Sequence, residues 1–507
     1  DEATFMLSGR RMYLDLLMPL ADPDGEAPRY YFYDFNAKVN SRLSESDRIF
    51  VSGYFGRDVL FSPESRNFDD EQFDISWGNA TANIRWMHIV SSSLFTNFSF
   101  IYTNYKFSTL LEENNRSNFE VFSGIQDLMV RGEAQYFPSE DHIIKIGLES
   151  TLHKFRVGAE QNSSNNDLDD LQINLSNISS LDASLYAQDE WKITPKFSTN
   201  IGARLYYFDQ GNYLRFEPRL SASYEIADGV QLKGSFAVAN QFLHLIVRND
   251  LWFPSTETIK PSQSVQGVLG ISTLLFDNEY LLTVETYYKG MSNLHEYKDN
   301  AAFSFGAPLD SQFTVGGGKA YGLEVFFNKR LGSFTGWIGY TLAWTQRTFP
   351  ELNNGKMFYP RYDRRHDVSL VLTYKLGESW ELGATWVYGS GQAYTVPSGQ
   401  YSFDPIEGNE NTDYYSSNTY NDYTERNAYR LPAFHKLDLN FMHKFSWFNL
   451  PWELSLNVYN AYNHKNTFAQ FIGYDYNNSG SSGYAKRVVK RVTLFPFLPS
   501  VGLGFKF

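Results

Sequence analysis

The sequence of 507 residues contains no cysteine, which excludes disulfides, thiolate metal sites and cysteine nucleophiles. No window approaches the run of about 18 apolar residues that a membrane-spanning helix requires. The 9 histidines show no HExxH or comparable metal-ligand spacing, so neither a metal nor a cofactor is expected. The net charge is −13 and no basic stripe stands out, so nucleic acid is not an expected partner.

Aromatic residues are abundant instead. They make up 17% of the chain, with 35 Tyr and 42 Phe, yet the mean hydropathy is −0.39. This composition provides much aromatic surface without a large dry core. Two classes fit it, a soluble all-β protein and a membrane-spanning β-barrel.

Alternation with a period of two residues recurs along the chain, as strands require. In the segment 31–42, Tyr31, Tyr33 and Phe35 lie on one face and polar residues occupy most of the other. The polar faces are too charged to form the second half of a sandwich core. The segments run roughly 10 to 15 residues, the length of a tilted strand that crosses a bilayer, which favours the barrel. Similar alternation occurs in 197–207, 368–375, 380–388 and 436–444.

Short and long connections follow one another regularly, which is typical of outer-membrane barrels. Joined in hairpins, the segments predict about 20 strands. At a strand spacing of about 4.8 Å, such a barrel is roughly 40 Å wide, so its lumen is an aqueous pore or holds a plug. The short turns are SESDR, VSSS, PSED, TPK, ADG, FDNE, LGS, LGES and FNLP, and the long loops are 156–181, 242–260, 300–316, 347–363 and 391–428.

Five segments stand out along the chain. They are FMLSGRRMYLDLL, YYFYDFNAKVNSRLSESDRIFVSGYFGRDVLF, YTLAWTQRTFPELNNGKMFYPRYDRRHDVSLVLTYKLG, GQAYTVPSGQY and LSLNVYNAYNHKN. Taken together and in this order, they resemble the barrel of TonB-dependent outer-membrane receptors. The resemblance covers essentially residues 1–507 and implies an all-β transmembrane antiparallel barrel of about 22 strands, closed by an N-terminal plug. It also implies the energy-transducing TonB complex as a partner, and outer-membrane lipid and lipopolysaccharide as surroundings.

The front end departs from that family pattern, because neither a plug domain nor a TonB box is visible. We expect both, together with two barrel strands, upstream of Asp1. In that arrangement the C-terminus is periplasmic and the long loops face outward. The final VGLGFKF then places Val501 and Leu503 against lipid, and its Phe505 and Phe507 resemble the C-terminal insertion signal of bacterial barrels.

Two loop regions are candidates for contact with a ligand. YPRYDRRHD gathers guanidinium groups that could grip carboxylate or phosphate, although the same residues could form a charge network that orders the loop. The aromatic loop near 392–430 could bind a ligand or pack on itself. Candidate contact residues are Tyr359, Arg361, Tyr362, Arg364, Arg365, His366, Tyr401, Phe403, Tyr414 and Tyr415.

An enzyme is not expected, since GxSxG is absent and no Ser, His and acid group stands out by spacing. Adjacent His295 and Glu296 point to opposite faces of a strand, so they cannot chelate one ion without a bulge. Three functions remain. The first is energised uptake of a nutrient such as a siderophore, glycan or peptide. The second is a structural subunit of a multi-protein outer-membrane complex, with its lumen permanently plugged and surface lipoproteins docked on its loops, and the third is a passive porin.

Overall fold

A computed structural model describes most of the chain. The described residues are 3–16, 29–62, 72–113, 117–163, 171–246, 251–298, 312–397, 399–403, 418–423, 425–475, 486–493 and 495–505. Within these ranges no helix is long and apolar enough to cross a membrane. The regular elements are strands, one short 3-10 helix, η1 (Asn353–Gly355), and a helical turn at 14–16.

Twenty strands belong to one antiparallel sheet, as the sequence predicts. They are β1 (Ala3–Arg11), β2 (Arg29–Arg42), β3 (Asp47–Phe61), β4 (Gln72–Ser91), β5 (Leu94–Glu113), β6 (Ser117–Ser139), β7 (His142–Ser163), β8 (Leu171–Thr194), β9 (Phe197–Phe208), β10 (Tyr213–Ala227), β11 (Val230–Gln241), β14 (Ser262–Leu275), β15 (Tyr280–Tyr297), β16 (Phe313–Lys329), β17 (Phe334–Thr348), β18 (His366–Leu376), β19 (Trp380–Gly389), β24 (Phe434–Trp447), β25 (Leu450–Tyr459) and β28 (Leu498–Phe505).

Four small hairpins lie in the long connections. They are β12 (Leu243–Ile246) with β13 (Leu251–Pro254), β20 (Ala393–Tyr394) with β23 (Tyr429–Arg430), β21 (Gly399–Phe403) with β22 (Asn418–Asp422), and β26 (Thr467–Asp475) with β27 (Lys486–Thr493).

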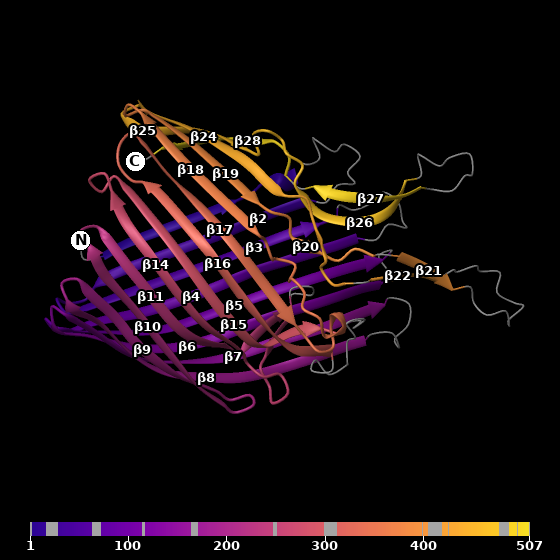
Figure 1. The fold of residues 1–507 in the computed structure, drawn as a ribbon, viewed down its shortest axis with the longest axis horizontal. Helices are drawn as coiled ribbons and strands as arrows, with labels where there is room; N and C mark the ends of the chain where they lie inside the picture. Colours follow the sequence, from indigo (N-terminus) through magenta and orange to yellow (C-terminus); the bar gives the residue numbers. More distant parts are fainter. Residues whose placement is uncertain are drawn as a thin grey trace, which may run out of the picture. The chain divides into compact units, whose positions relative to one another are not determined.

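The chain divides into two compact units. The first comprises Asp1–Ala222, Phe236–Val265 and His295–Phe313. Within it β1 to β9 pair in sequence order, so that each strand lies beside the next (Figure 1).

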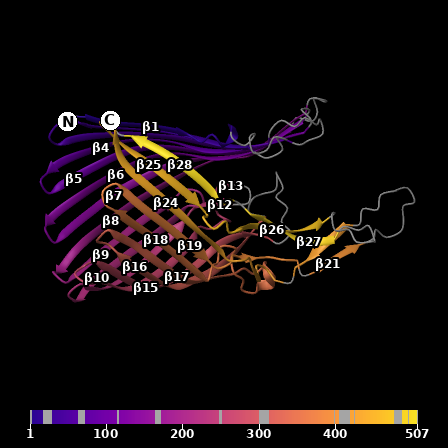
Figure 2. The ribbon, with the colours of Figure 1, turned by 90° about the horizontal axis from the view of Figure 1, so that it is seen from above.

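The second unit comprises Ser223–Ser235, Gln266–Leu294 and Thr314–Phe507. Here β16 to β19 pair in order, and β19 continues through β24 and β25 to β28. The β26–β27 hairpin extends beyond the ends of β24 and β25 (Figure 2).

All nine predicted short turns join consecutive strands, so that part of the pattern is confirmed. The predicted loop 156–181 is wrong at both ends, because Arg156 pairs with Asn177 and Gln161 with Leu171 in the ladder of β7 and β8. Strands β4 to β8 are 20 to 24 residues long, beyond the expected length. Backbone hydrogen bonds do not depend on an apolar face, so a ladder continues where the side chains have become polar.

The burial pattern is the reverse of that in a soluble sheet. In β2 the apolar Phe35 and Val39 are 57% and 45% exposed, whereas Asp34 on the opposite face is 5% exposed. In β7 Leu148 is 57% exposed, while His153, on the opposite face, is 4% exposed. We call the face with exposed apolar side chains the outer face and the opposite one the inner face. The outer face suits contact with hydrocarbon.

The last strand follows the same rule. Val501, Leu503 and Phe505 in β28 are 73%, 60% and 52% exposed, and the Phe505 ring lies 4.8 Å from that of Trp452. Phe507 lies outside the described residues.

Candidate functional site

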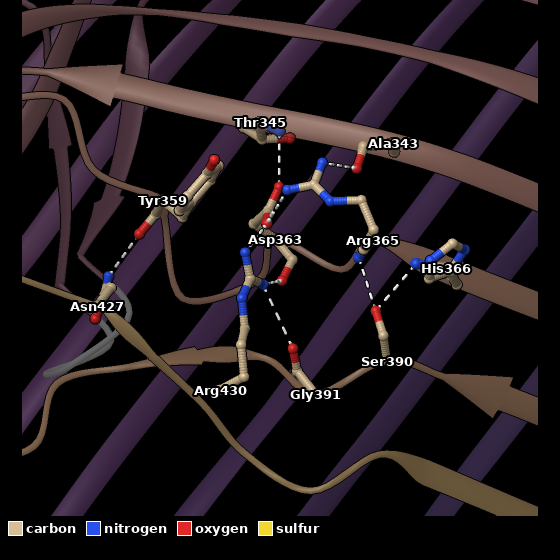
Figure 3. A network of polar contacts seen from close by, with 10 residues as sticks. All are labelled: Ala343, Thr345, Tyr359, Asp363, Arg365, His366, Ser390, Gly391, Asn427 and Arg430. Carbon is tan, nitrogen blue, oxygen red and sulfur yellow. Dashed lines mark hydrogen bonds and ion pairs between the residues drawn. The ribbon is translucent and has the colours of Figure 1, made fainter.

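The long connection from β17 to β18 is built on a buried carboxylate. The Asp363 side chain is 1% exposed. Its Oδ1 accepts a hydrogen bond of 2.7 Å from the backbone N–H of Thr345, in β17 (Figure 3). A carboxylate removed from water in this way requires cationic or N–H partners.

Two arginines, far apart in the sequence, compensate that charge. Nη2 of Arg430 pairs with Asp363 Oδ2, and Nη1 of the same guanidinium donates to the Asp363 carbonyl (Figure 3). Nη2 of Arg365 lies 3.6 Å from Oδ2, and its Nη1 donates to the Ala343 carbonyl at 2.6 Å. The cluster therefore ties the base of the β17–β18 connection to the end of the segment 390–430.

Aromatic rings cover the same guanidinium groups. The Arg365 guanidinium carbon lies 4.5 Å from the ring centroid of Trp344 and 5.6 Å from that of Tyr359. That of Arg430 lies 5.0 Å from the Tyr359 ring. Asn427 Nδ2 donates to the Tyr359 carbonyl at 2.8 Å. Cation–π contact and hydrogen bonding together hold both connections in one arrangement.

The backbones also approach closely here. Ser390 Oγ accepts from the backbone N–H groups of Arg365 and His366, at 2.8 and 3.0 Å (Figure 3). A Cβ on Gly391 would lie 1.5 Å from the Leu431 carbonyl oxygen, so only glycine fits this crossing.

The predicted contact residues divide into two groups. Tyr359 and Arg365 belong to the buried cluster, and His366 Nδ1 is 3.0 Å from the hydroxyl of Tyr340. Arg361 is exposed, and Tyr362 is 57% exposed with its hydroxyl accepting from Arg347 at 2.7 Å. At this connection the structure thus combines a charge network that orders the loop with an exposed guanidinium and phenol.

The remaining predicted residues are Arg364, Tyr401, Phe403, Tyr414 and Tyr415. The Arg364 guanidinium lies 3.8 Å from the Asp367 carboxylate and 5.8 Å from the Phe434 ring. Tyr401 and Phe403 belong to β21, which pairs with β22. Tyr414 and Tyr415 lie outside the described residues.

Sequence reasoning missed Arg430 and Thr345 as partners of Asp363. The signal for Asp363 itself was available, since an acid inside YDRRHD has arginines on its C-terminal side. Nothing in the sequence marks Arg430, which is 67 positions away.

A second feature lies on the inner face of the first unit. Strand β13 contacts β6 and β7. Phe253 packs with Val157, Ile259 and Phe313 in a buried apolar cluster, and its ring is stacked on that of Phe313 at 5.3 Å. The long connection after β11 therefore folds inward rather than projecting away from the sheet.

Two histidines lie next to this apolar cluster. Their ring centroids are 4.7 Å apart, His244 Nε2 is 2.9 Å from Ser255 Oγ, and His295 Nε2 donates to the Lys260 carbonyl at 2.8 Å. Burial, together with the nearby His295, lowers the pKa of His244 to about 3, so His244 is neutral at pH 7. Across the described ranges, no three His, Cys, Asp or Glu side chains are grouped as a metal would require.

A protein-family match covers most of the chain. The family model described as "TonB dependent receptor-like, beta-barrel" matches residues 19–461. No curated protein sequence matches the chain.

Solved structures are similar in fold at low sequence identity. The ferric-catecholate import receptor Fiu from E. coli K12 is 13% identical, with a TM-score of 0.63 and coverage of 99% of this chain and 77% of its own. The siderophore receptor PirA from Acinetobacter baumannii is 11% identical, with a TM-score of 0.64 and coverage of 100% and 76%. The copper transporter OprC is 12% identical, with a TM-score of 0.62 and coverage of 95% and 73%.

Proposed function

Because this chain belongs to the TonB-dependent receptor-like β-barrel family, we propose that it captures a scarce metal chelate at the Gram-negative outer membrane and imports it in an energised step. The family match over residues 19–461 carries the proposal. Structures of this family are outer-membrane β-barrels of receptors and transporters, and the reversed burial of the strands agrees with that setting.

Partners follow from the same proposal. A plug domain would close the lumen, and the TonB complex would supply the energy that rearranges it. The barrel would support the plug and seal it into the membrane. Under this proposal the long connections face outward and the C-terminus is periplasmic, because the short turns all lie at the opposite ends of the strands.

The capture surface in this proposal is the rim formed by the β17–β18 connection. The Asp363 cluster keeps its base rigid, while Arg361 and Tyr362 remain exposed. A guanidinium next to a phenol suits an anionic, oxygen-rich chelate, such as a ferric siderophore. Rigid support of this kind lowers the entropy cost of binding. The names of the neighbours support a metal-bearing cargo but do not select one, since they include both siderophore receptors and a copper transporter.

Growth and uptake assays test the proposal. A deletion strain should lose growth under iron limitation on one or more defined ferric siderophores, and the wild-type gene should restore it. The variant R361A/Y362A should weaken uptake at low chelate concentration, whereas K356A, which removes another exposed cation of the same connection, should not.

The same experiments distinguish the proposed uptake function from the two alternatives, a structural subunit and a porin. Normal growth of the deletion strain on every chelate, with stoichiometric co-purification of surface lipoproteins, would favour a structural subunit. An open-pore conductance of the intact protein would favour a porin.

A further inference from the structure

The outer face of the first unit carries a row of cations separated by glycines. Arg57 of β3 is opposite Gly78 of β4, which is opposite Lys106 of β5. Lys106 is opposite Gly124 of β6, which is opposite Arg156 of β7. One register line therefore crosses five neighbouring strands with a cation on every second strand. We call Arg57, Lys106 and Arg156 the outer cation row.

The row lies at the edge of the exposed apolar surface. Phe55, two positions before Arg57, is 45% exposed on the same face of β3. Leu152, four positions before Arg156, is 37% exposed on the same face of β7, and Lys154 between them is exposed too. Side chains two and four positions apart share a face. Arg57 and Arg156 lie toward the strand ends that lead into the connections 62–71 and 164–170, and Lys106 lies on the register line between them, toward the three-residue connection 114–116.

Only glycine fits at the two positions between the cations, so no side chain stands there. A Cβ on Gly78 would lie 2.3 Å from the Gly56 carbonyl oxygen, and one on Gly124 would lie 2.7 Å from that of Tyr105. A hollow of about 390 Å³ opens over this part of β3 to β5, lined by Arg57, Gly78 and Lys106 among others. Cations on alternate strands are about 10 Å apart at a strand spacing of about 4.8 Å, so an oxyanion can enter between two of them.

The row is positive although the chain as a whole has a net charge of −13. Among the described residues, Lys106 and Arg156 have no ion-pair partner, and Arg57 Nη2 donates to Ser76 Oγ at 3.2 Å. The carboxylate of Glu120, which lines the same hollow, accepts a hydrogen bond of 2.6 Å from Ser108. Asp74 of β4 and Glu160 of β7 are further acids at positions of this face, four positions from Gly78 and from Arg156, and Glu160 is directly opposite Glu120.

We propose that the outer cation row binds the phosphate groups of an anionic glycolipid in the outer leaflet. This rests on the proposed function in one respect, the placement of the longer connections on the outer side of the membrane. The apolar surface next to the row would contact acyl chains, so the cations lie at the level of the headgroups. A lipid can contact the cations with its phosphate and the neighbouring apolar surface with its acyl chains. An acidic protein would instead have to extend to the edge of the bilayer to reach the cations.

The test uses the full chain, reconstituted in phosphatidylcholine nanodiscs with bis-phosphorylated lipid A or with lipid A from which the phosphates have been removed. Bound glycolipid is counted by native mass spectrometry. Wild-type protein should prefer the phosphorylated form, and the triple variant R57Q/K106Q/R156Q should bind it about 10-fold more weakly or worse, since each cation near an anionic lipid surface contributes a several-fold effect.

A matched control removes three exposed cations that lie outside the row, in K38Q/K192Q/K196Q. It should bind as the wild type does, and heat-dependent gel mobility should show that both variants are folded. Equal binding of the two lipids by the wild type, or equal binding of phosphorylated lipid A by both variants, would overturn the proposal. Displacement by millimolar inorganic phosphate alone would show a site for free phosphate instead. Chelate uptake is measured separately, so loss of one property does not decide the other.

Discussion

Replacing Asp363 by Asn removes the charge on which the β17–β18 connection is built and changes almost no volume. The Asn side-chain oxygen can still accept from the Thr345 N–H, but its amide cannot pair with Arg365 or Arg430. Two guanidinium groups then remain next to a buried neutral side chain.

The magnitude follows from burial. Removing one partner of a buried ion pair costs about 3–5 kcal/mol. The Arg365 and Arg430 side chains are 23% and 34% exposed, whereas that of Asp363 is 1% exposed. Water can therefore recover part of the loss, and we expect about 2–3 kcal/mol for local opening of the loop base. At about 1.4 kcal/mol for each factor of ten, this is roughly 30- to 150-fold.

Hydrogen exchange measures the opening directly. The amides of Thr345, Arg365 and His366 are hydrogen-bonded within the cluster, so their protection should fall by that factor in D363N. The control D367N removes an acid that is 49% exposed and 3.8 Å from Arg364, and should change protection less than about three-fold. Equal protection in D363N and D367N would refute the assignment of Asp363 as the anchor.

Three further predictions concern other parts of the molecule. The variant L148R puts a charge on the outer face and should lower barrel stability in lipid by about 2–4 kcal/mol, whereas N97R, on the inner face opposite Glu133, should be tolerated in refolding titrations. Phe253 is 3% exposed, so F253A should cost about 3–5 kcal/mol and admit protease to the β12–β13 hairpin, unlike F448A, where the ring is 78% exposed. The pKa of His244 is lowered from 6.5 to about 3, so the open hairpin binds a proton that the folded one does not. Hairpin stability should therefore fall as pH drops from about 6.5 toward 3, and hydrogen exchange should show a smaller fall in H244N, where only the half-buried His295, whose pKa is also lowered by burial, still contributes.

Strand alternation and turn positions could be read directly from the sequence. A period of two residues is a local property of the strand, and a short polar turn between two such segments already implies a hairpin. For the same reason the outer face of β28, with Val501 and Leu503 exposed, was predictable. The limits of the strands were less so, because the ladder of β7 and β8 continues where apolar residues no longer mark it.

The candidate site was predictable only in part. The motif YDRRHD predicts a charged cluster, and the sequence left open whether that cluster contacts a ligand or orders the loop. In the structure Arg365 belongs to the charge network around Asp363, whereas Arg361 is exposed. That division depends on Arg430, which is 67 positions from Asp363 and reaches it only when the two connections fold together.

The sequence alone determined the class of the protein, because strand alternation, turns and family motifs each depend only on residues that are close together in the sequence. Tertiary structure decided which side chains meet. The inward β12–β13 hairpin packs on β6 and β7, and the outer cation row appears only when four ladders are in register. A shift of one residue in any ladder would move a cation to the other face, so this feature depends on the registers and not on any single segment.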